Sequence, residues 1–122
     1  MKVRIKENSI RYRLTRSEVA EFCTNGKITT WTNFNEQTLY YTLMSDNDTK
    51  DMKATLESHI IIVTMPESYR NEWKKEDKVG FQHDMILNDG AIMNILIEKD
   101  FVCLDERDED DSDNYPNPKA HN

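Results

Sequence analysis

Apolar and basic residues alternate one by one along much of the first fourteen positions of the chain. The segments 2–6 (KVRIK) and 9–14 (SIRYRL) each place an apolar side chain at every second position. A period of two is typical of a β-strand that buries one face. Glu7 and Asn8 stand between the segments and fit a two-residue hairpin loop. The pattern predicts a β-hairpin with one apolar face and one charged face.

The predicted loop also sets which residues face each other across the hairpin. Arg4 falls opposite Arg11, Lys2 opposite Arg13, and Lys6 opposite Ser9. The cationic face predicted in this way consists of Lys2, Arg4, Lys6, Arg11 and Arg13. Arginines on neighbouring strands present forked donors that suit phosphate or carboxylate. Three interpretations stay open: a solvated sheet face, a docking site for the chain's own acidic tail, and a site for a small external anion.

The rest of the chain continues in alternating strand and helix patterns. Thr15 and Glu18 form a capping box that begins a helix, and Asn25-Gly26 ends it. Further strands are predicted at 27–34, 38–44, 53–57, 59–65, 79–87 and 91–98, with a second helix after Pro66. Trp31, Tyr40, Tyr41 and Trp73 lie at strand and helix spacing, which favours positions in the core.

The order strand, strand, helix, strand, strand thus occurs twice. An offset of 51 residues places Ile5 on Leu56, Ile10 on Ile61 and Phe22 on Trp73. Such a match is typical of an internal duplication, although two amphipathic segments can also match by chance. We expect an α+β fold with a mostly antiparallel sheet, curved or closed as a barrel and built from a duplicated unit. The second half lacks the arginines of the first hairpin, so the fold itself does not require them.

Charge divides the chain into a domain and a tail. We expect one α+β domain over residues 1–104 and an acidic C-terminal tail, partly ordered or disordered, over residues 105–122. Residues 98–122 contain nine acidic and three basic residues. Tyr115-Pro116-Asn117-Pro118 is a stiff, extended element with an aromatic anchor that can lie against a domain or a partner.

Several classes of function are disfavoured by composition. A net charge of −7 argues against nucleic acid as a partner, and no apolar run is long enough for a membrane helix or a signal peptide. We therefore expect a cytoplasmic protein. Cys23 and Cys103 lack a metal-binding spacing and are expected to be buried free thiols. We expect no cofactor, no metal site and no catalytic residue, because no nucleophile, phosphate-loop or metalloprotease motif occurs.

The two ends of the chain carry motifs that resemble those of a known family. The motifs are KVRIKENSIRYRLTRSEV at residues 2–19, EKDFVCLD at 98–105, and EDDSDNYPNP at 109–118. They are similar to those of a family of small, uncharacterised bacterial proteins that contain a domain of unknown function. The resemblance covers the whole chain and implies no activity, cofactor or site residue. It does imply that the acidic tail belongs to the native protein.

The residues themselves favour a non-enzymatic binding or accessory protein. In this hypothesis the cationic face and the acidic, proline-ended tail contact a protein partner or a second copy of the chain. The alternative is a small enzyme or sensor that binds an anionic metabolite, such as a nucleotide or a phosphate ester, at Arg4, Arg11 and Arg13.

Overall fold

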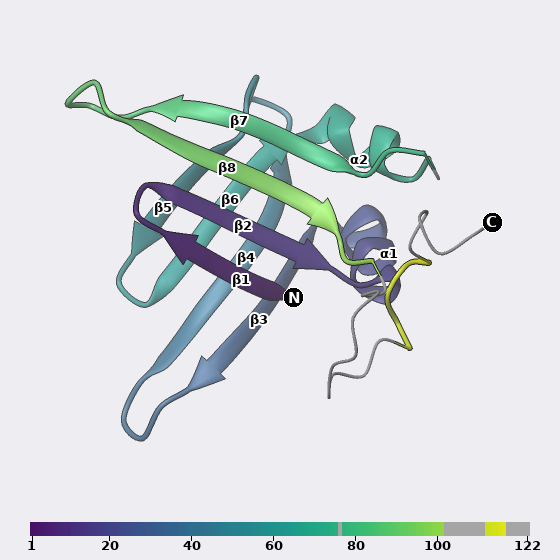
Figure 1. Ribbon diagram of the computed structural model, residues 1–122, viewed down its shortest axis with the longest axis horizontal. Helices are drawn as coiled ribbons and strands as arrows, with labels where there is room; N and C mark the ends of the chain where they lie inside the picture. The colour runs from purple at the N-terminus through teal and green to yellow at the C-terminus, as the bar shows by residue number, and fades with distance from the viewer. Residues whose placement is uncertain (76, 102–111, 117–122) are drawn as a thin grey trace.

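The computed structural model describes residues 1–75, 77–101 and 112–116, and contains eight strands and two helices in that part of the chain (Figure 1). The first half of the chain forms β1 (Lys2–Lys6), β2 (Ser9–Leu14), α1 (Arg16–Asn25), β3 (Lys27–Asn33) and β4 (Thr38–Asp46). The second half forms β5 (Lys53–Glu57), β6 (Ile60–Pro66), α2 (Glu67–Trp73), β7 (Gly80–Ile86) and β8 (Ile92–Lys99). The predicted order of elements is confirmed.

The strands form two separate four-stranded sheets that cross each other, with the helices at one end (Figure 1). Sheet A has the order β1-β2-β8-β7 and sheet B the order β3-β4-β6-β5. The hairpins are antiparallel, but β2 pairs with β8 and β4 pairs with β6 in parallel. The α+β class is confirmed. The expected mostly antiparallel sheet, curved or closed as a barrel, is instead two mixed sheets, neither of which closes into a barrel. Alternation identifies a strand but not its neighbour, and here each half sends its second hairpin to the opposite sheet.

Each sheet therefore contains one hairpin from each half of the chain. Tyr12 pairs with Ile97 in sheet A, and Val63 pairs with Leu43 at the equivalent place in sheet B. The two first hairpins repeat at the predicted offset even in their turns. Glu7 has a φ of 51° and Ser58 a φ of 52°, a left-handed conformation that is uncommon outside glycine. The sheets are thus two copies of one arrangement, related by a pseudo-two-fold rotation.

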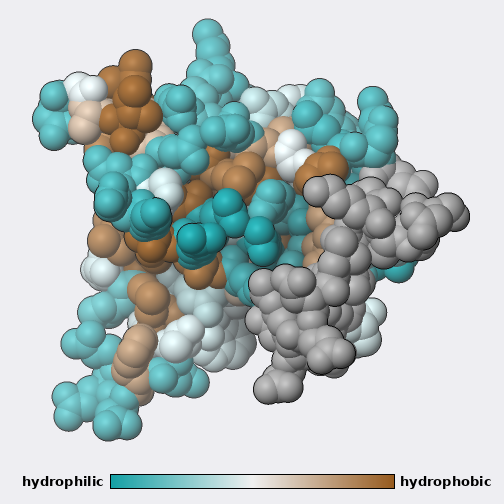
Figure 2. All heavy atoms as spheres, in the orientation of Figure 1, coloured by the Kyte–Doolittle hydropathy of each residue, from teal (hydrophilic) through white to brown (hydrophobic). Residues whose placement is uncertain are grey.

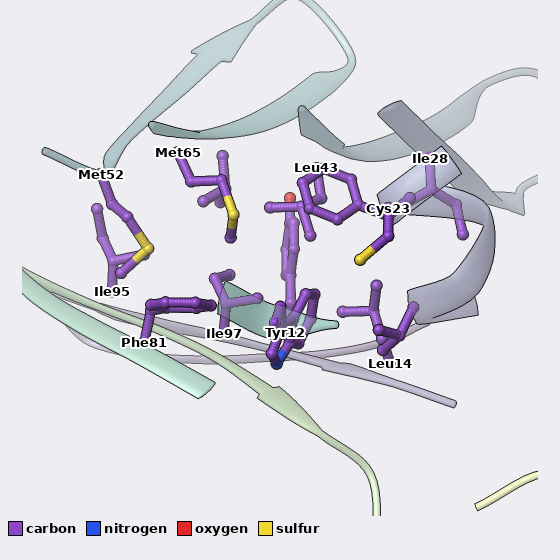
Figure 3. Close-up of a cluster of buried hydrophobic side chains, with 14 of the residues drawn as sticks. Tyr12, Leu14, Cys23, Ile28, Leu43, Met52, Met65, Phe81, Ile95 and Ile97 are labelled. Carbon is purple, nitrogen blue, oxygen red and sulfur yellow. The ribbon is translucent and has the colours of Figure 1, made fainter. Parts of the chain in front are cut away.

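The hydrophobic core lies between the inner faces of the two sheets (Figure 3). Tyr12, Leu14 and Ile97 project from sheet A toward Leu43 and Met65 of sheet B. The helices close one end of this layer, where the rings of Phe22 and Trp73 meet edge to face at 6.0 Å. The side chain of Trp73 is fully buried, as the sequence predicted.

Two other aromatic side chains lie outside the core. Trp31 is 58% exposed and Tyr40 is 40% exposed, so their expected core positions were wrong. Strand register explains the difference. Their neighbours Ile28 and Leu43 lie at inward positions of β3 and β4, and Trp31 and Tyr40 occupy positions of the opposite parity. Both therefore stand on the outer face of sheet B.

The local signals of α1 act as the sequence predicted. The hydroxyl of Thr15 accepts a bond from the amide of Glu18, and the Glu18 carboxylate accepts one from the amide of Thr15 at 2.9 Å. Gly26 ends the helix with a φ of 77°. Cys23 on this helix is a buried free thiol, as expected, and burial raises its pKa. Cys103 and the proposed domain boundary at residue 104 lie outside the described residues.

Candidate functional site

The five predicted cations come together on the outer face of sheet A. Arg4 pairs with Arg11, Lys2 with Arg13, and Lys6 with Ser9, so the predicted register is confirmed. Ile10, Tyr12 and Leu14 point into the core at the alternate positions. Figure 2 looks at this side of the molecule and shows strongly hydrophilic side chains over β1 and β2. The hairpin therefore presents its basic residues together to solvent.

A carboxylate from β8 lies against two of the arginines. Because β2 runs parallel to β8, Glu98 is the neighbour of Arg13. The Nε atom of Arg13 donates to Oε1 of Glu98 at 2.8 Å, and Nε of Arg11 lies 3.7 Å from the same oxygen. The cationic face thus already holds one carboxylate supplied by the protein. This contact depends on the parallel β2–β8 pairing, which the sequence pattern did not indicate.

A second carboxylate, that of Asp100, meets the beginning of β1. The Nζ atom of Lys2 lies 3.1 Å from Oδ2 of Asp100, whose side chain is only 4% exposed. The Asp100 amide donates to the carbonyl of Leu14 at 2.8 Å, which fixes this residue at the end of β2. One end of the cationic face is therefore neutralised by Glu98 of β8 and by Asp100, which directly follows that strand.

The other end keeps unneutralised charge. Neither Arg4 nor Lys6 forms an ion pair with an acidic residue within the ranges 1–75, 77–101 and 112–116. A shallow depression of about 300 Å³ lies over the hairpin, lined by Lys2, Val3, Arg4, Arg11 and Arg13. Each guanidinium carries five N–H donors, so Glu98 leaves most of the donors of Arg11 and Arg13 available. The site offers Arg4, Arg11 and Arg13 to an anion at the surface.

Part of the acidic tail docks beside this site, at the first turn of α1. The amide of Arg16 donates to the carbonyl of Asp113 at 2.9 Å. The Asp113 carboxylate accepts bonds from the hydroxyl and the amide of Ser17. The bond from the Ser17 hydroxyl, followed by one from Thr15, holds the pKa of Asp113 below its usual value. A helix N-terminus favours a negative charge placed in this way.

An aromatic anchor completes the docking, as the sequence suggested for Tyr115. The centre of the Tyr115 ring lies 5.8 Å from the guanidinium of Arg16 and 5.1 Å from the ammonium of Lys99. Its amide donates to the carbonyl of Asp100 at 2.8 Å, and burial raises the pKa of its phenol. The described part of the tail therefore binds α1 and the end of β8. Residues 105–111 and 117–122, which include Asn117-Pro118, lie outside the described residues.

No group of three or more His, Cys, Asp or Glu side chains in the described residues is placed to hold a metal ion. Neither of the two described helices is long and apolar enough to cross a membrane.

A family model covers residues 1–119, which is nearly the whole chain. The chain belongs to DUF7009, a family of unknown function. The resemblance found in the terminal motifs is thus confirmed at the level of a domain of unknown function. No curated protein and no solved structure matches the chain. Membership in DUF7009 assigns no activity, so function must be argued from the site.

Proposed function

We propose that this chain is a non-enzymatic binding or accessory protein that holds an acidic segment of a protein partner on its cationic face. One observation carries the proposal. Arg11 and Arg13 already coordinate the carboxylate of Glu98, while Arg4 beside them forms no ion pair with an acidic residue in the described part of the chain. A row of carboxylates on a partner would extend this pairing along β1.

The internal repeat supports a role beyond folding for these charges. The second hairpin has Thr55, Ile62 and Thr64 where the first has Arg4, Arg11 and Arg13, and it forms the same structure. The arginines are therefore dispensable for the hairpin. Adjacent like charges destabilise a strand pair, so their presence calls for an anion that offsets the repulsion.

A glutamate-rich synthetic peptide with a fluorescent label tests the proposal by anisotropy. We expect binding that weakens with salt, and a loss of about tenfold for Arg4→Thr, the size expected when one charge-assisted contact is lost. Arg4→Thr installs the residue that sheet B carries at this place. Lys53→Thr is the matched control, because it removes the same charge from the other sheet. Equal effects of the two variants would exclude a specific site at Arg4.

The alternative function is a small enzyme or sensor for an anionic metabolite. The depression of about 300 Å³ over Arg4, Arg11 and Arg13 favours it, because that volume is at the lower end of small-molecule sites. A thermal shift panel of inorganic phosphate, nucleotides and phosphate esters separates the two. A rise of several degrees with one compound supports the alternative. A flat panel together with peptide binding supports the protein partner.

A further inference from the structure

The outer face of sheet B carries exposed aromatic and apolar side chains. One row across its four strands consists of Trp31, Tyr40, Ile60 and Glu57, paired strand to strand. The first three are 58%, 40% and 37% exposed. The next row consists of Thr29, Thr42, Ile62 and Thr55, and contains no charge, with Thr42 itself buried between its neighbours. A surface whose middle carries no charge and whose aromatic residues are exposed is typical of a protein interface.

Because the two sheets are equivalent, each position on the outer face of sheet B can be compared with its counterpart in sheet A. Sheet A has Asp84 where sheet B has Trp31, and Arg11 where sheet B has Ile62. It also has Glu98 at the place of Met44. The same architecture thus accepts charged residues at these positions, so packing does not require the apolar ones.

The charges at the border of the face complement each other under a two-fold rotation. The third row consists of Lys27, Met44, Thr64 and Lys53, so Lys53 and Glu57 stand at opposite ends of the same side of β5. They are four residues apart, about 13 Å along the strand, which is too far for an ion pair within one chain. A two-fold axis that lies above the outer face, parallel to the Thr29–Thr55 row, brings the first row of each copy over the third row of the other.

We propose that the outer face of sheet B is the interface of a homodimer with this two-fold axis. Glu57 of each copy then meets Lys53 of the other, which gives two ion pairs. Trp31 meets Lys27 of the other copy and can stack with its ammonium group. Tyr40 lies over Met44 of the other copy, and Ile60 lies over the position of Thr64, whose side chain is already buried within its own chain. Twisted sheets pack with their strands within about 30° of each other, and the long side chains at the corners span that offset.

The area of the outer face of sheet B sets the expected affinity of the dimer. Four strands about 4.8 Å apart and about six residues long cover roughly 400 Å² on each copy. This is about half the area per partner of a standard stable interface, so the dimer should be weak. The proposal concerns a different face from the cationic one, and it stands or falls independently of the proposed function.

Sedimentation equilibrium of the full chain from about 10 µM to about 1 mM tests the proposal. We expect a monomer–dimer equilibrium within this range. Trp31→Asp, which installs the residue of sheet A, should weaken the dimer at least tenfold. Ile86→Asp is the matched control, because Ile86 is equally apolar and 74% exposed but lies at the tip of the β7–β8 hairpin. A monomer at every concentration, or equal effects of both variants, would overturn the interface.

Charge reversal tests the axis itself. Glu57→Lys and Lys53→Glu should each weaken self-association, because each places like charges together at two corners. An equimolar mixture of the two variants should dimerise again, since every corner then pairs Lys with Glu. Unchanged circular dichroism of the single variants excludes unfolding as the cause. Failure of the mixture to recover would rule out the proposed axis.

Discussion

At the scale of single residues, Tyr12 connects the two sheets through a buried polar atom. Its side chain is fully buried, and its hydroxyl donates to the carbonyl of Ile61 in sheet B at 3.2 Å (Figure 3). Desolvation by burial raises the pKa of this phenol well above its ordinary value. The folded state therefore keeps Tyr12 neutral at a pH where the unfolded chain ionises it.

This difference predicts a loss of stability in alkali. Below a pH of about 10 the Tyr12 phenol is neutral in both the folded and the unfolded state, so it lowers the free energy of unfolding by nothing there. Above it the unfolded state loses its proton first, so the free energy of unfolding falls by about 1.4 kcal/mol per pH unit until the folded pKa is reached. Urea denaturation at several pH values should show this slope, and Tyr12→Phe should reduce it. An unchanged slope in the variant would contradict the assignment.

At the scale of elements, the tail segment 112–116 acts as a partner for the first turn of α1. Tyr115→Ala removes the ring that Arg16 and Lys99 contact, and should release the segment. In the unmodified protein the amides of Arg16 and Ser17 donate hydrogen bonds to Asp113. In the variant these amides should exchange faster with solvent. Hydrogen exchange followed by NMR measures this. Tyr115→Phe keeps the ring and should retain the protection, whereas equal exchange in both variants would argue against anchoring by the ring.

The elements were the part of the fold that could be predicted, because their signals are local. Alternation located β1 and β2 and their register, and the capping box with Gly26 located α1. The partner of each hairpin could not be predicted, because parallel pairing of β2 with β8 joins residues about 85 positions apart and leaves no local pattern. The cationic face was therefore found, but Glu98 and Asp100 beside it were missed. Trp31 was misplaced because strand parity alone does not say which face is inward.

At the scale of the whole molecule, neither half of the chain can complete a sheet alone. Each sheet joins one hairpin of the first half to one of the second through β2–β8 or β4–β6. Fragments 1–48 and 49–122 should therefore be largely unfolded when separate, since a lone hairpin is only marginally stable. Mixed in equal amounts, they should regain the circular dichroism of the intact chain. Cooperative unfolding of either fragment alone would show that the halves are independent.

The packing of the two sheets through their inner faces also determines what a dimer could bind. The outer faces of sheets A and B lie on opposite sides of one hydrophobic layer, so occupation of one leaves the other open. Two copies joined through sheet B would turn their Arg4 side chains away from each other, toward separate ligands. Such a dimer would be bivalent, and weak contacts at each end would combine into avidity for a target that repeats its acidic motif.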